Sequence, residues 1–122
     1  AYLQNHELEK QGEAIAAEHL QRHGYQLIAR NWRYQQQEID LIAWEGVTQV
    51  LVFVEVKTRS TNYFGYPETA VDTKKQQFLI NAANAYLQNH ELDCELRFDV
   101  IAIILSGQQV QELTHVRDAI IP

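Results

Sequence analysis

Three charged side chains lie where two apolar segments of the sequence end, and their types and spacing are those of a hydrolytic site. Glu55 and Lys57 follow the apolar run VLVFV of residues 50–54, and Asp40 lies within EIDLIAW, residues 38–44. Side chains two apart share one face of a strand. Glu55 and Lys57 therefore end a face that is otherwise apolar, where charged groups are uncommon without a structural or chemical role.

A hairpin between these two segments would bring the acidic groups together. With a turn at Glu45-Gly46, Asp40 should lie across from or diagonal to residues 53–55. Two neighbouring carboxylates repel each other unless a cation compensates their charge. Mg²⁺ prefers carboxylates, a carbonyl and waters. Such a site hydrolyses phosphodiesters, because the metal polarises the phosphate and activates water. From spacing alone, a salt-bridge cluster at the strand ends is the alternative.

The elements that must position these side chains follow the order α-β-β-β-α-β. This order predicts an α/β fold, with a mixed sheet flanked by helices. The expected elements are a helix over 3–23 capped by Gly24, strands over 25–33, 38–44 and 48–58, a loop over 60–67, a helix over 70–90, a strand over 95–105 and a short edge strand over 109–113. The residues after 113 are not assigned to an element.

Length and composition indicate one globular domain over residues 1–122. The chain is 46% hydrophobic and 21% charged, and it has no run of about 18 apolar residues, so we expect no membrane span. The N-terminal AYLQNHELEK carries charges where a secretory signal would be apolar. Cys94 is the only cysteine, which excludes an intrachain disulfide and suits a reducing cytoplasm. We therefore expect a cytoplasmic protein.

The charge balance limits the kind of nucleic-acid contact. A net charge of −6 counts against a protein that coats nucleic acid through a broad basic surface. It leaves room for a local basic cleft, and Arg30, Arg33, Arg59 and Lys74 bracket the acidic residues in the sequence. We expect these four to contact a DNA backbone, with ordinary solvated charge as the alternative for each.

The sequence contains two further patterns. His19 and His23 are four residues apart on a predicted helix, a spacing that can bind zinc. No third ligand with suitable spacing is evident in the sequence, which favours a solvated helix face.

The octapeptide AYLQNHEL occurs at residues 1–8 and again at 85–92. Eight residues are too few for a solenoid repeat, so a small duplication is the simplest interpretation.

A set of positions spread along most of the chain forms a recognisable pattern. These positions are Gly12-Glu13, Ala16, Leu20, Gly24-Tyr25, ARNWR (29–33), EIDLIA (38–43), VFVEVKTR (52–59), Gly65, Pro67, Ala70-Val71, Lys74 and RFDVIAI (97–103). In this pattern the chain resembles the UPF0102 (YraN-like) family, which is similar to archaeal Holliday-junction resolvases and belongs to the PD-(D/E)xK nuclease superfamily.

The resemblance implies a restriction-endonuclease-like fold and a role for each site residue. It implies that Asp40 and Glu55 hold Mg²⁺ or Mn²⁺, with the Val56 carbonyl expected as a third ligand. It also implies that Lys57 is the catalytic lysine and Glu13 a further acid from the first helix.

The residues themselves support Glu13 only modestly. It heads a stripe of small or apolar side chains, Ala16, Ala17 and Leu20, that should face the sheet. A solvated glutamate is the alternative. Glu38 matches the family pattern and shares a strand face with Asp40, whereas Gln37 stands where the family usually has glycine.

The resulting hypothesis is a metal-dependent DNA endonuclease, with branched, Holliday-junction-like DNA implied as substrate by resemblance alone. Symmetric cleavage of two strands would require a homodimer, for which the sequence offers no evident interface. The rival hypothesis is a non-catalytic module that retains the fold and binds a nucleic acid or a protein. A third is a structural scaffold whose acidic ends contact a basic partner.

Overall fold

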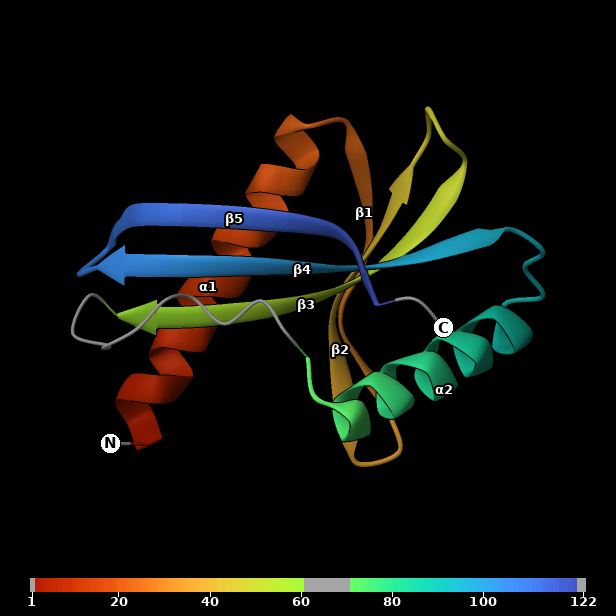
Figure 1. Cartoon of the computed structure of the whole chain (residues 1–122), viewed down its shortest axis with the longest axis horizontal. Helices are drawn as coiled ribbons and strands as arrows, with labels where there is room; N and C mark the ends of the chain where they lie inside the picture. The colour runs from red at the N-terminus through yellow and green to blue at the C-terminus, as the bar shows by residue number, and fades with distance from the viewer. Residues whose placement is uncertain (1, 61–70, 121–122) are drawn as a thin grey trace.

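The computed structural model describes residues 2–60 and 71–120 and consists of a five-stranded sheet with two helices (Figure 1). The predicted 60–67 loop, apart from Ser60, lies outside the described residues. The elements are α1 (Tyr2–Arg22), β1 (Tyr25–Tyr34), β2 (Gln37–Glu45), β3 (Val50–Ser60), α2 (Thr73–Asn89), β4 (Glu95–Ser106) and β5 (Gln109–Ile120). The α/β class and the flanked mixed sheet are confirmed, and the order extends to α-β-β-β-α-β-β.

The strands follow one another across the sheet in the order β1-β2-β3-β4-β5. Only β3 and β4 are parallel, and α2 makes the crossover between them. β3 is therefore the central strand. Residues 51–54 of this strand are all buried, so it is covered on both faces.

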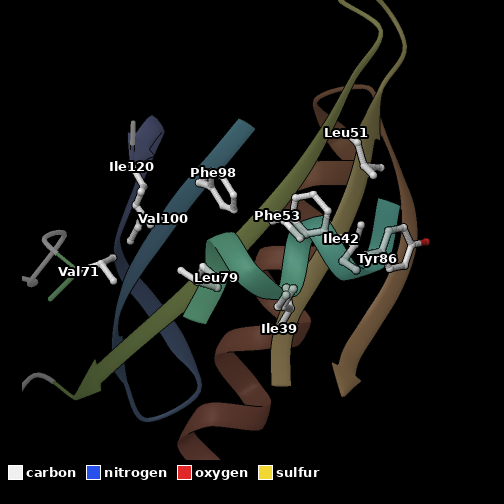
Figure 2. Close-up of a cluster of buried hydrophobic side chains, with 12 residues drawn as sticks. Ile39, Ile42, Leu51, Phe53, Val71, Leu79, Tyr86, Phe98, Val100 and Ile120 are labelled. Atoms are coloured by element: carbon white, nitrogen blue, oxygen red, sulfur yellow. The ribbon is translucent and has the colours of Figure 1, made fainter. Parts of the chain in front are cut away.

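Each helix covers one face of the sheet. Ala16, Ala17 and Leu20 of α1 are buried against a cluster that includes Val52 and Val54. The predicted stripe of α1 therefore does face the sheet. On the other face, α2 closes a core of alternate strand residues, shown in Figure 2 with Leu79 and Tyr86 of the helix beside Phe53 and Ile42 of the sheet. Gly24 ends α1 with φ +85°, a conformation that favours glycine.

β5 is longer than the predicted edge strand. It runs over twelve residues to Ile120, and it includes residues that the sequence left unassigned. Buried Asp99 of β4 explains part of this extension, because it accepts hydrogen bonds from His115 Nε2 at 2.8 Å and from the Asp118 N–H at 3.0 Å. These contacts join residues 16 and 19 positions apart, so local patterning does not reveal them.

The expectation of a solvated His19 is wrong. His19 is half-buried, and its Nε2 lies 3.1 Å from Nδ1 of His115. Burial and the neighbouring His23 and His115 lower the pKa of His19. His19 therefore joins a polar network that runs from α1 through His115 of β5 to Asp99 of β4.

Candidate active site

The site is built where β2 and β3 separate. Their antiparallel pairing extends to Leu41 opposite Val54, after which β2 continues beside β1 and β3 continues beside β4 (Figure 1). Asp40 and Glu55 are the next residue on each strand, and they lie across this fork. The expected register is confirmed.

At the fork, the Asp40 side chain accepts the backbone hydrogen bond of β3 that β2 no longer accepts. Its Oδ2 accepts a hydrogen bond from the Val56 N–H at 2.8 Å. An unpaired buried N–H is costly, and β2 has already moved away from β3 at this point. The carboxyl group is thereby held in a fixed position, and a side-chain hydrogen bond also joins it to Glu55.

The electrostatics of the pair are those of two carboxyl groups held close together in a largely buried site. Burial, followed by the charge and hydrogen bond of Glu55 and the charge of Glu13, raises the pKa of Asp40 far above its ordinary value, against the opposing effect of the Val56 N–H. Two carboxylates this close together repel each other. The charge of a bound divalent ion would stabilise both of them.

α1 reaches the fork through a close contact at Gly12. A Cβ at this position would overlap the buried Thr58 hydroxyl and lie 2.9 Å from the Thr58 Cβ. Glycine therefore lets the helix approach β3 closely. The next residue, Glu13, then reaches the fork where the pairing of β2 and β3 ends.

Glu13 is held by β1 as well as by its own helix. Burial raises the pKa of Glu13, while a hydrogen bond with Asn31 and the charge of Arg30 oppose this effect. Asn31 and Asp40 both fall between the Arg30–Leu41 and Trp32–Ile39 pairs of β1 and β2. Asn31 has φ 52°, a conformation that is uncommon outside glycine.

A pocket of about 250 Å³ collects these groups. It is lined by Glu9, Glu13, Asp40, Glu55, Val56, Lys57, Thr58 and Arg59. The structure thus brings to one pocket the four predicted catalytic residues, the predicted carbonyl ligand and one of the predicted DNA-contacting arginines.

The other three predicted DNA contacts do not line the pocket. Arg30, on β1, is exposed, and its charge acts on Glu13 of α1. Arg33 is 63% exposed, and its Nη1 lies 3.6 Å from Oε1 of Glu38. Lys74 is exposed on the first turn of α2. These side chains are available to a ligand larger than the pocket.

Lys75 is a site residue that the sequence analysis missed. Its Nζ lies 3.3 Å from Oε2 of Glu55, and both side chains are largely buried, at 30% and 14% exposed. Lys75 heads the buried stripe of α2, with Leu79, Ala82 and Tyr86 at +4, +7 and +11. Glu13 was directed toward the sheet because it heads a stripe of small or apolar side chains. The same helical spacing would have identified Lys75.

The donors in the pocket fit a hard cation. Within residues 2–60 and 71–120, no three His, Cys, Asp or Glu side chains are grouped as a metal-binding set. The expected set is two carboxylates, Asp40 and Glu55, with the main-chain carbonyl of Val56. These are oxygen ligands of the kind that Mg²⁺ and Mn²⁺ accept together with several waters.

The central parallel pair, the helices on both faces and the acidic fork define an α/β protein of restriction-endonuclease-like fold. The family model described as "Uncharacterised protein family UPF0102" matches residues 12–103. The chain belongs to this family, as the sequence resemblance indicated.

Relatives cover nearly the whole chain. A UPF0102 protein of Chlorobium phaeobacteroides is 49% identical over 109 residues, which span 88% of this chain and 84% of the relative. One from Christiangramia forsetii is 44% identical over 116 residues, 95% of each chain. One from Geobacter metallireducens is 42% identical over 118 residues, 96% of this chain and 94% of the relative.

Neither helix within the described ranges combines the length and apolarity that crossing a membrane requires.

Proposed function

We propose that this protein is a Mg²⁺- or Mn²⁺-dependent DNA endonuclease. The observation that carries the proposal is the meeting of Asp40 and Glu55 at the fork of β2 and β3, in one pocket with Lys57. Asp40 lies within β2 and Glu55 and Lys57 lie within β3, so the pairing of the buried sheet fixes their backbone positions. Preorganised groups of this kind stabilise charge that develops during reaction.

Each residue has a distinct role in this proposal. Asp40, Glu55 and the Val56 carbonyl hold the cation, which when bound polarises the phosphate and lowers the pKa of a water. Lys57 orients the attacking water and stabilises the developing negative charge. Glu13, held by Asn31, adds a further acceptor on the α1 side of the pocket.

The surrounding basic residues bind the DNA backbone in this proposal. Arg59 lines the pocket, and its Nη1 donates to the Thr58 carbonyl at 2.9 Å, which fixes the guanidinium near the fork. Arg30, Arg33 and Lys74 are the outer contacts. Such phosphate contacts position a duplex without reading its sequence. Branched DNA as the preferred substrate rests on family similarity alone.

The test is cleavage of linear, supercoiled and four-way-junction DNA with and without Mn²⁺. We expect metal-dependent cleavage by the unaltered chain and its loss in Asp40→Ala and Lys57→Ala, with both variants remaining folded by circular dichroism. Full activity in both folded variants would refute the assignment. Sedimentation of the protein with junction DNA establishes whether two copies act together, as symmetric cleavage requires.

A non-catalytic binding module is the second candidate, and the ion pair of Lys75 with Glu55 favours it, because an internal cation already compensates one carboxylate. The net charge of −6 points the same way. Calorimetric titration with Mn²⁺ separates the two. Absence of binding at millimolar metal would favour the module.

A further inference from the structure

A second pocket lies between the tip of the β1–β2 hairpin and α2. Its volume is about 380 Å³, and it is lined by Tyr34, Gln35, Gln36, Gln37 and Phe78. In Figure 1 the hairpin tip lies beside the first turns of α2. The size is that of a small-ligand site, and the lining combines two aromatic rings with three amides.

The aromatic part continues into the protein. The rings of Trp32 and Tyr34 are stacked at an interplanar angle of 9°, with centroids 6.2 Å apart. Tyr34 and Phe78 follow at 6.1 Å and 43°. Trp32 is in turn edge-on to buried Tyr86 at 5.1 Å. The two rings in the pocket are therefore supported by the core, and they form a rigid apolar surface.

Two of the three amides, those of Gln35 and Gln36, come from a turn whose backbone conformation is unfavourable for glutamine. Tyr34 pairs with Gln37, which leaves Gln35-Gln36 as a two-residue turn. Gln35 has φ 57°, where such a turn favours glycine, asparagine or aspartate. Glutamine amides each offer two donors and one carbonyl acceptor. The turn therefore places hydrogen-bonding groups at the edge of the aromatic surface.

Lys75 connects this pocket to the candidate active site. Its Nζ lies 5.0 Å from the centroid of the Phe78 ring and 3.3 Å from Oε2 of Glu55. One side chain thus contacts both an aromatic ring of the second pocket and a proposed metal ligand of the first. The two pockets are therefore neighbours, joined through the Lys75 side chain.

We propose that the hairpin pocket binds one unstacked nucleobase of the DNA strand held at the fork. The base stacks on Tyr34 and Phe78, and its edge meets the amides of Gln35, Gln36 and Gln37. Aromatic faces accept any base, whereas amides discriminate by hydrogen bonding. A fully paired duplex offers no free base to this pocket, so DNA with an unpaired nucleotide is the favoured substrate. This inference rests on the proposed nuclease function.

The test compares two DNAs that differ only at the candidate base. One is a duplex with a short single-stranded arm carrying 2-aminopurine at the junction; the other has the same base paired. The unaltered chain, Tyr34→Leu and Gln37→Ala are titrated with both in Ca²⁺, and cleavage of both is measured in Mn²⁺. Gln111→Ala, on the exposed part of β5, is the matched control. Melting curves confirm that each variant is folded.

We expect tighter binding of the arm-containing DNA and quenching of 2-aminopurine fluorescence by the unaltered chain. Tyr34→Leu should reduce the preference for the arm about 10-fold, in the range found for loss of one stacking contact. Gln37→Ala should reduce it less, and Gln111→Ala not at all. Equal binding of both DNAs, or a preference unchanged in Tyr34→Leu, overturns the base pocket while metal-dependent cleavage still stands. Absence of both DNA binding and cleavage overturns the nuclease function itself.

Discussion

The ammonium nitrogen of Lys75 lies 3.3 Å from a carboxylate oxygen of Glu55, so α2 contributes a charge to a site otherwise built from β2, β3 and α1. Its neighbour Lys74 is exposed, because adjacent residues of a helix face different directions. The two lysines therefore provide a matched pair of substitutions.

Because the Lys75 ammonium lies beside Glu55 at the proposed phosphate site, we expect Lys75→Gln to lower the rate of Mn²⁺-dependent cleavage about 100-fold, the scale for losing one preorganised charge-stabilising group. Mn²⁺ should bind Lys75→Gln at least as tightly as the unaltered chain, since the cation competing for Glu55 is removed. Lys74→Gln should change the rate far less. Single-turnover cleavage and calorimetry measure the two quantities. Equal rates for both variants, or weaker Mn²⁺ binding by Lys75→Gln, would contradict this role.

Asp40→Asn should stabilise the metal-free chain while abolishing metal binding. The amide retains an acceptor for the Val56 N–H and removes repulsion with Glu55. Replacing a residue that is kept for function rather than for stability typically raises the unfolding free energy by about 1 kcal/mol. Mn²⁺ should raise the Tm of the unaltered chain by mass action and leave that of Asp40→Asn unchanged. Scanning calorimetry with and without Mn²⁺ is the measurement, and a lower metal-free Tm in Asp40→Asn would count against the arrangement.

Gly12→Ala tests the close approach of α1. Alanine improves helix propensity by about 1 kcal/mol, but its Cβ would overlap the Thr58 hydroxyl, and overpacking typically costs about 1–3 kcal/mol. We expect net destabilisation in urea unfolding and reduced cleavage as Glu13 is displaced. Gly46→Ala is the control, because a Cβ there meets only the Trp44 Nε1 at 3.8 Å. In a Thr58→Ala background the cost of Gly12→Ala should fall; an unchanged cost would refute the contact.

Acid should destabilise the protein through Asp99. Burial raises the pKa of this carboxyl, but hydrogen bonds from His115, Arg97 and the Asp118 N–H outweigh it and lower the pKa to about 2. Because the folded value lies below the unfolded value of about 4, Asp99 stabilises the fold above pH 4. That contribution, about 2 kcal/mol, is lost as the pH falls from about 4 to 2.

Unfolding free energies from pH 7 to 2 measure this loss. Asp99→Asn should be destabilised at pH 7, because it removes one of the two carboxylates that pair with Arg97 in this buried cluster. Its stability should depend less on pH in the acid range. Asp93→Asn carries the same substitution at an exposed position and should behave like the unaltered chain. Parallel acid profiles for Asp99→Asn and the unaltered chain would exclude this source of acid sensitivity.

The sequence by itself determined the class of fold and most of the site. Strand alternation placed Glu55 and Lys57 on one face, and helical spacing directed Glu13 toward the sheet. The Glu45-Gly46 turn signal indicated a hairpin that brings Asp40 near residues 53–55, without fixing the exact register. These are local properties, since each depends on periodicity within an element or on one short turn. Lys75 was open to the same helical argument and was overlooked.

Only the tertiary structure decided where β2 leaves β3, because that fork depends on each strand having a second neighbour. It also decided the extent of β5, which Asp99 holds from another strand. The repeated octapeptide shows the reason most directly. Its first copy lies in α1 as helix from Tyr2, whereas in the second copy α2 ends at Asn89 and Glu91 takes φ 50°. Identical local preferences had different outcomes, because the chain beyond residue 92 must enter the sheet as β4.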